Sequence, residues 1–166
     1  MKIVGIQKLT LLDYPGQVAC TVFLGGCNFR CPFCHNSRLV INPSQQAEFS
    51  EEEILGYLKK RQGILDGVAI TGGEPLMQID FLLELFTLAK KKGIHTCLDT
   101  SGIAYNPNGN PDWLAKMDAL CEVTDLVMLD IKHIDDEEHK KLTAQSNKNI
   151  LDFARYLNEI DFPIWV

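Results

Sequence analysis

The chain has 166 residues, a formal net charge of −6 and 46% hydrophobic residues, which fits one domain with a sizeable core. The acidic balance argues against nonspecific nucleic-acid binding, because no basic stripe is available to neutralise phosphates. The N-terminal stretch is too polar for a signal peptide, and no apolar run approaches the roughly 18 residues of a membrane span. We therefore expect a cytoplasmic protein with neither nucleic acid nor membrane as a partner.

Apolar runs and amphipathic segments alternate along the chain. The first apolar run, residues 18–24, predicts a strand, and the polar stretch 37–49 predicts a connection. The later predicted strands are 67–71, 94–100, 125–132 and 162–166, and the predicted helices are 50–62, 80–93, 110–122 and 149–160.

Local signals mark the ends of these helices. Ser50 and Glu53 form a capping-box pattern ahead of an apolar stripe. Gly93 follows three lysines and is typical of a helix stop. Asn110 is expected as an N-cap, with Pro111 at the first helical position.

The alternation of strands and helices predicts an α/β fold with parallel strands and right-handed crossovers. About five strands cannot close an eight-stranded barrel. We therefore expect a partial (β/α) barrel, an open parallel sheet with outer helices, formed by one domain over residues 1–166. No internal repeat or domain linker is recognisable.

Each of the first four predicted strands ends in a polar or glycine-rich stretch. These stretches are residues 25–27, 71–74, 99–102 and 130–132. In parallel α/β folds, ligands bind outside the carboxyl ends of the strands. The sequence therefore predicts that four polar loops converge on one site.

The loop "GGCNFRCPFCHN" places Cys27, Cys31 and Cys34 within eight residues. A zinc site completed by His35 would need two adjacent side chains to turn to one ion, whereas zinc spacings usually come as separated pairs. A disulfide would leave one thiol over. An iron–sulfur cluster fits better, because three thiolates on four irons leave one iron open.

The other cysteines and two of the histidines have simpler interpretations. Cys20 and Cys97 lie in apolar runs and are expected to be buried as small hydrophobes, and Cys121 has no assigned role. His95 starts a strand and His139 lies in a charged run, so neither is expected to have a chemical role.

The spacing Cys27-x3-Cys31-x2-Cys34, with Phe33 before the last cysteine, resembles the radical S-adenosylmethionine (SAM) superfamily. The resemblance implies a [4Fe-4S] cluster whose fourth iron is bound by the amino and carboxylate groups of SAM. In the family, an electron from the reduced cluster splits SAM into methionine and a 5′-deoxyadenosyl radical, which abstracts a hydrogen atom. The "TGGEP" stretch after the second strand is typical of the loop that binds the SAM amino group.

Two subfamilies share the resemblance. Residues 75–166, with "HTCLDTSG" and "EVTDLVMLDIKHIDDEEHKKLT", resemble the activating enzymes of pyruvate formate-lyase, whereas the first half resembles activases of anaerobic ribonucleotide reductase. Both imply a glycyl radical enzyme as partner, pyruvate formate-lyase being favoured, and flavodoxin or ferredoxin as electron donor. The family extends past "FPIWV", so we expect the chain to lack the C-terminal part of the family fold.

The resemblance also assigns roles to individual residues. It implies cluster ligation by three cysteines, a SAM site, a possible monovalent-cation site and a residue near the partner's glycine loop. The implied cluster ligands are Cys27, Cys31 and Cys34, and the residue near the glycine loop is Asp13. The implied SAM site consists of Phe33, His35, Gly72, Gly73, Glu74, Asp99, Ser101, Asp130, Ile131 and Lys132. The implied cation site consists of Asp99, Thr100, Met128 (by its carbonyl) and Asp130.

Simpler interpretations stay open beside these roles. Asp99 and Asp130 follow the pattern of helix N-caps, Lys132 that of a solvated surface lysine, and residues 13–16 that of a turn. The alternatives for the whole chain are a radical SAM enzyme acting on a small molecule, such as the carboxy-deazaguanine synthases, and a non-catalytic iron–sulfur or zinc protein. The activase-like stretch "MLDIKHIDDEEH" argues against the first.

Overall fold

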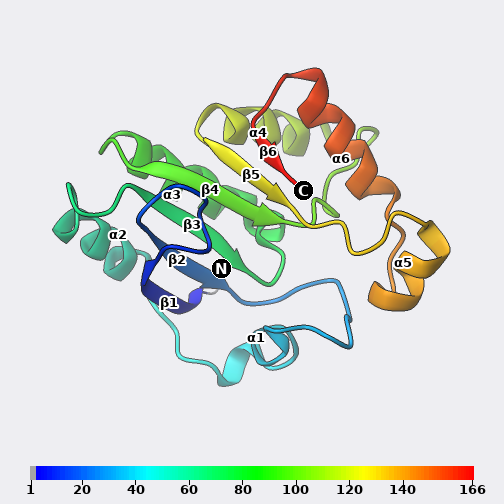
Figure 1. Ribbon diagram of the computed structural model, residues 1–166, viewed down its shortest axis with the longest axis horizontal. Coiled ribbons are helices and arrows are strands. Elements are labelled where there is room, and N and C mark those ends of the chain that lie inside the picture. The colour runs from blue at the N-terminus through cyan, green and yellow to red at the C-terminus, as the bar shows by residue number, and fades with distance from the viewer. Residues whose placement is uncertain (1–2) are drawn as a thin grey trace.

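The computed structural model describes residues 3–166. Its six strands form one sheet, in which they follow one another in chain order (Figure 1). The first strand is antiparallel to the second, and every later pair is parallel. The strands are β1 (Ile3–Thr10), β2 (Ala19–Leu24), β3 (Gly67–Gly72), β4 (His95–Thr100), β5 (Leu126–Leu129) and β6 (Ile164–Trp165). The parallel α/β partial barrel that the sequence predicts is confirmed.

Four helices pack on one face of the sheet and share one apolar core with it. They are α2 (Glu51–Lys60), α3 (Ile79–Lys90), α4 (Pro111–Glu122) and α6 (Lys148–Glu159). Two shorter helices, α1 (Ser37–Ile41) and α5 (Asp136–Thr143), lie beyond the carboxyl ends of the strands (Figure 1). Single 3₁₀ turns occur at Pro43–Gln45 and Pro75–Gln78. Among residues 3–166, no helix is long and apolar enough to cross a membrane.

The predicted helix ends are confirmed. The Ser50 hydroxyl accepts a hydrogen bond from the Glu53 amide at 3.1 Å, and the Glu53 carboxylate accepts one from the Ser50 amide at 2.7 Å. The Asn110 side chain accepts a hydrogen bond from the amide of Asp112 at 2.8 Å. Gly93 ends the segment after α3 with a φ of +70°, a left-handed conformation that glycine adopts without strain.

The sequence did not predict β1, α1 or α5. Two of the buried positions of β1 are adjacent at its start and the third is at its end, and Gln7, Lys8 and Leu9 are all exposed, so the strand shows no clean alternation. Helix α1 lies in the stretch 37–49 that was interpreted as a connection. Helix α5 is strongly charged and buries only two residues, His139 and Thr143, which leaves too little apolar periodicity to recognise.

The last strand pairs beside β5, with Val127 opposite Ile164 and Met128 opposite Trp165. Ile164 is partly buried and Trp165 is 59% exposed, so burial alternates along the strand. Val166 lies outside the strand and is 81% exposed. The observed strand is therefore shorter than the predicted strand 162–166.

Candidate functional site at the carboxyl ends of the strands

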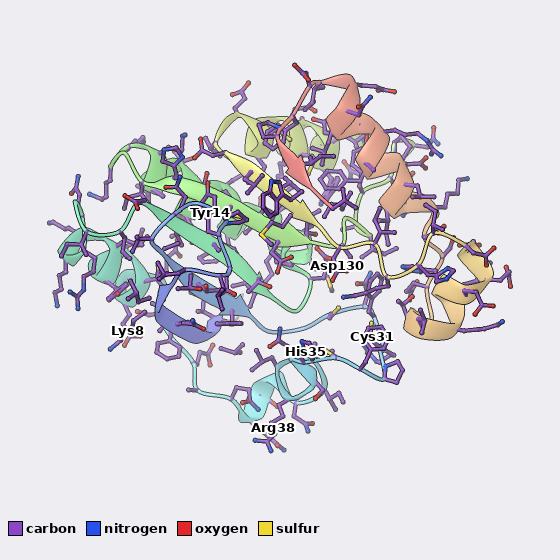
Figure 2. All side chains as sticks on the ribbon, in the orientation of Figure 1. Lys8, Tyr14, Cys31, His35, Arg38 and Asp130 are labelled. Carbon is purple, nitrogen blue, oxygen red and sulfur yellow. The ribbon has the colours of Figure 1, made fainter. Side chains whose placement is uncertain are left out.

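A cavity of about 540 Å³ lies at the carboxyl ends of β2 to β5. Side chains from all four predicted loops line it, and Figure 2 shows Cys31, His35 and Asp130 at this end of the sheet. The residues with sequence-predicted roles that line the cavity are Cys27, Cys31, Phe33, Cys34, His35, Gly72, Gly73, Glu74, Asp99, Thr100, Ser101, Asp130 and Lys132. The convergence expected from the topology is thus present.

Three residues with predicted roles lie away from the cavity lining. Ile131 packs against the main core, and Met128 packs beside Tyr14 on the face of the sheet that the helices leave uncovered. Asp13 accepts a hydrogen bond from the Thr21 hydroxyl at 2.6 Å. The turn expected at residues 13–16 is present, because the Gln17 amide donates to the Tyr14 carbonyl at 3.2 Å.

The cysteine loop leaves β2 at Leu24 and runs along the rim of the cavity. All three thiols are half-buried and free. The Cys27 Sγ accepts a hydrogen bond from the Phe29 amide at 3.3 Å. Burial raises the pKa of Cys27, and the charges of Glu74, Cys31 and Cys34 raise it further. Burial likewise raises the pKa of Cys31, while nearby Lys132 opposes that rise.

The spacing of these thiols suits a group with several metal atoms. Within residues 3–166, no three His, Cys, Asp or Glu side chains converge closely enough to hold one metal ion. Ligands that bind separate irons need not meet at one point. The thiols feel one another's charge, so positive iron would favour the thiolates that a cluster requires.

The glycines after β3 allow two loop backbones to touch. A Cβ on Gly73 would lie 1.7 Å from the Gly26 carbonyl oxygen, and Gly72 has a φ of +112°. The amides of Gly73 and Glu74 donate to the carbonyls of Leu24 and Gly26 at 2.8 and 2.9 Å. The sequence predicted glycines that admit a ligand, and in the structure they admit the backbone of the cysteine loop.

Glu74 is buried, with 2% of its surface exposed, and its carboxylate bonds to the loop after β4. One oxygen accepts hydrogen bonds from the Leu76 amide at 3.1 Å and from the Thr100 hydroxyl. The other accepts from the Ser101 amide at 3.1 Å and the Ser101 hydroxyl at 2.5 Å. An ionised carboxylate has about four acceptor positions, and all four are used here. The carboxylate therefore joins the ends of β3 and β4, and its contact with the SAM amino group stays a prediction.

Strand register brings the predicted cation residues together. Asp99 lies opposite Met128 and accepts a hydrogen bond from the Thr71 hydroxyl at 2.6 Å. Burial raises the pKa of Asp99, and the charge of Asp130 adds to the rise. Two carboxylates that repel each other favour a cation between them. Neither caps a helix, because Asp99 lies in β4 and Asp130 precedes Lys132 in a loop.

Lys132 is not a free surface lysine. Its ammonium pairs with the Asp130 carboxylate and lies 5.9 Å from the centre of the Phe33 ring. Phe33 is 48% exposed at the cavity rim, so a charged pair and an aromatic face meet there. The predicted flanking position of Phe33 therefore has a cation–π contact in this structure.

Several residues that hold the site together carry no sequence signal of their own. The side-chain amides of Asn36 and Gln78 donate to the carbonyls of Gly72 and Gly25, both at 3.3 Å. The end of α5 also contacts the cysteine loop, because the Arg30 backbone amide donates to the Thr143 carbonyl at 3.0 Å. Such contacts depend on tertiary placement, so no motif or spacing indicates them.

A sequence profile of the radical SAM superfamily matches residues 21–166. Pyruvate formate-lyase-activating enzymes of Listeria monocytogenes and Streptococcus mutans are each 41% identical to the chain, over 97% and 93% of its length. The chain spans 65% and 59% of those relatives. The match extends through both halves of the chain.

Solved structures show the same fold. A domain of a pyruvate-formate lyase-activating enzyme from Bacteroides vulgatus matches 59% of this chain and 56% of its own, with a TM-score of 0.51 and 28% identity. Streptococcus suis SuiB bound to S-adenosylmethionine matches 84% of this chain and 29% of its own, with a TM-score of 0.60 and 16% identity. At that identity, the second match concerns the fold alone.

Proposed function

Because this chain belongs to the radical SAM superfamily, we propose that it cleaves S-adenosylmethionine reductively and abstracts a hydrogen atom from a glycine of a partner glycyl radical enzyme. The cofactors of the family are a [4Fe-4S] cluster and SAM. The cluster, when bound, supplies the electron for cleavage, and the chain's own residues bind and orient. One observation carries the proposal: the cysteine loop and the three loops after β3, β4 and β5 line a single cavity.

Each loop has a distinct task in this proposal. Cys27, Cys31 and Cys34 would hold the cluster, which would leave one iron free for SAM. The backbone of residues 72–74 receives the methionine end of SAM, with Glu74 keeping that backbone in place through its bonds to the loop after β4. Phe33, at the rim, contributes an aromatic face to the nucleoside end.

The charged rim has tasks of its own. Lys132 pairs with one oxygen of Asp130 there, and the other Asp130 oxygen together with Asp99 attracts a monovalent cation. Asp13, on the uncovered face, is assigned to the partner's glycine loop.

The partner we favour is pyruvate formate-lyase, since relatives that carry the name of its activating enzyme are about 40% identical. Flavodoxin or ferredoxin is the proposed electron donor. We place the protein in the cytoplasm, where thiols stay reduced, because all six cysteines are free.

The test is anaerobic reconstitution with iron and sulfide, reduction, and addition of SAM with either pyruvate formate-lyase or anaerobic ribonucleotide reductase. We expect a glycyl radical doublet in the electron paramagnetic resonance spectrum with pyruvate formate-lyase. A doublet with the reductase alone would show that the partner is anaerobic ribonucleotide reductase and not pyruvate formate-lyase. SAM cleavage without a radical on either partner would favour a small-molecule substrate, and tightly bound zinc with no iron uptake would refute the enzymatic role.

A further inference from the structure

Residues 139–145, at the end of α5 and just after it, contact the part of the cysteine loop between its first two cysteines. The Arg30 amide donates to the Thr143 carbonyl at 3.0 Å, and the Gln145 side chain donates to the Asn28 carbonyl at 3.3 Å. The His139 ring meets the Phe29 ring edge to face, with centroids 5.6 Å apart and planes at 76°. Three successive loop residues are thus held by one distant segment.

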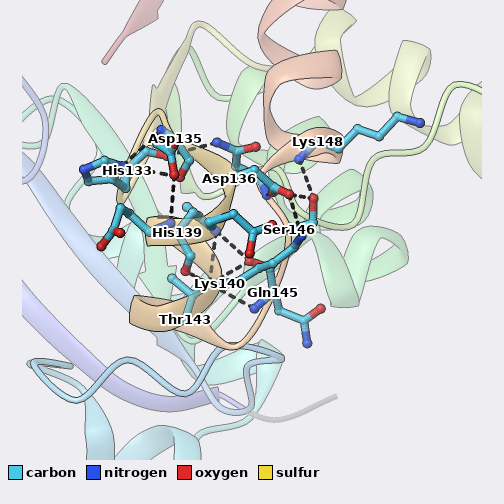
Figure 3. Close-up of polar contacts among 12 residues, drawn as sticks. His133, Asp135, Asp136, His139, Lys140, Thr143, Gln145, Ser146 and Lys148 are labelled. Carbon is cyan, nitrogen blue, oxygen red and sulfur yellow. Dashed lines mark hydrogen bonds and ion pairs between the residues drawn. The ribbon is translucent and has the colours of Figure 1, made fainter.

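His139 is buried although its helix is charged. Its exposed fraction is 0%, while its neighbours in α5 form ion pairs at the surface, as Figure 3 shows for Asp136 and Lys140. Its Nδ1 lies 2.8 Å from the Gln145 carbonyl oxygen, which can only accept, so Nδ1 carries the proton and donates. This bond fixes the plane of the ring.

The other ring nitrogen has no partner. Among the described residues, His139 Nε2 and Asn28 Oδ1 are buried polar atoms without a hydrogen bond. A buried polar atom left unpaired costs free energy and calls for a reason. A leucine or phenylalanine at position 139 would avoid that cost, so packing alone does not account for a histidine there.

The Phe29 contact leads directly to a predicted cluster ligand. Phe29 is buried, with 5% exposure, and its amide donates to the Cys27 Sγ at 3.3 Å. Phe29 thus connects the His139 ring, through its own ring, with the Cys27 sulfur, through its amide. Hydrogen bonds to sulfur are among the factors by which a protein tunes a cluster.

We propose that His139 is a positioning residue for Cys27: its ring, oriented by the Gln145 carbonyl, holds Phe29 so that the Phe29 amide points at the Cys27 sulfur. The proposal goes beyond the proposed function, and it rests on that function only in taking Cys27 as a cluster ligand. It assigns a role to a residue that touches neither cluster nor SAM.

The first test uses the cluster-free protein and measures how fast each loop thiol is alkylated by iodoacetamide. Trypsin cleavage after Arg30 leaves Cys27 in one peptide with Cys20 and Cys34 in another with Cys31, so fragmentation of each peptide in the mass spectrometer assigns the alkylated thiol. In His139→Leu we expect Cys27 to react roughly threefold to tenfold more slowly, because the Phe29 amide stabilises the reactive thiolate and this ordinary hydrogen bond is lost. Cys34, which has no link to α5 in the structure, should react at its wild-type rate.

Two further variants separate positioning from general loosening. Leu157→Ala removes buried apolar volume from α6 on the helix-covered face and serves as the control at an equal loss in melting temperature. His139→Phe keeps a ring against Phe29 but has no Nδ1 donor, so it should fold even if the leucine variant does not and should slow Cys27 to a smaller extent. Equal slowing in Leu157→Ala, or unchanged or faster Cys27 alkylation in both His139 variants, would overturn the proposal.

The second test uses the reconstituted protein and follows iron transfer to a chelator. His139→Leu should release iron faster than wild type by a similar factor, whereas Leu157→Ala should not. An equal release rate in His139→Leu and wild type would count against the positioning role. Failure of wild type to take up iron would refute the proposed function instead, while the alkylation experiment would still decide the role of His139.

Discussion

The cysteine loop and the loop after β3, which touch each other at the cavity, are built differently. The loop after β3 is held by contacts within the protein. Its glycines touch the neighbouring backbone, and both carboxylate oxygens of Glu74 accept internal hydrogen bonds. The cysteine loop has half-buried thiols and is held mainly by contacts from outside, at Phe29, Arg30 and Asn36. The loop after β3 is therefore ordered by its own internal contacts, whereas the cysteine loop depends on contacts from other segments.

Gly73→Ala should produce the largest effect on this arrangement. The new Cβ would lie 1.7 Å from a backbone oxygen that cannot move without displacing the cysteine loop. We expect a loss of at least about 3 kcal/mol in the free energy of unfolding, the upper range for overpacking, measured by urea denaturation. Gly56→Ala is the control: nothing lies within 4 Å of its Cβ, and a helical alanine should stabilise by about 0.5–1 kcal/mol. Similar stability of both variants would mean that the two loops do not touch.

Glu74→Gln should have a smaller effect on the same loop. The amide group would place two donors against the amide and hydroxyl of Ser101, or against Thr100, where the carboxylate accepts. A loss of about 1–3 kcal/mol in unfolding free energy is expected for buried groups left unpaired. Exposed Glu159→Gln at the end of α6 should change stability by less than about 0.5 kcal/mol. If Glu74→Gln were as harmless as the control, the link between β3 and β4 would be wrong.

The smallest expected effect is the loss of hydrogen bonds at α5, the helix that contacts the cysteine loop, when the pH is lowered. Hydrogen bonds from Lys140, Ser146 and the Asn147 amide lower the pKa of Asp136 to about 2, against about 3.9 for an unfolded aspartate. A lowered pKa gives stability that is complete above about pH 4 and is lost as the pH falls through about 2. The Asn147 amide proton, which donates to Asp136 at 2.9 Å, should shift in NMR spectra with a midpoint near pH 2. A midpoint near pH 4 would show that these bonds do not persist in solution.

Much of the fold could be predicted because its signals are local. Capping residues and apolar runs mark α2, α4 and the parallel strands, and strand ends indicate where ligands bind. Strand β1 and helix α5 could not be predicted, since the first lacks alternation and the second lacks an apolar stripe.

For the site, the cysteines and glycines carry recognisable spacing, so the loops could be identified. What Glu74 bonds to, and why His139 is buried, depend on contacts between segments far apart in sequence, which no window of residues contains.

The central claim is that three loop thiols hold a cluster and leave one iron for SAM. The most direct measurement reconstitutes the wild type and six cysteine-to-alanine variants anaerobically, counts bound iron, and records the electron paramagnetic resonance of the reduced protein with and without SAM. We expect loss of iron in Cys27→Ala, Cys31→Ala and Cys34→Ala, retention in the variants at positions 20, 97 and 121, and a wild-type spectrum that changes when SAM is added. If Cys20→Ala, a buried strand residue with 0% exposure, lost iron as severely as Cys31→Ala, or if SAM left the wild-type spectrum unchanged, the account would be contradicted.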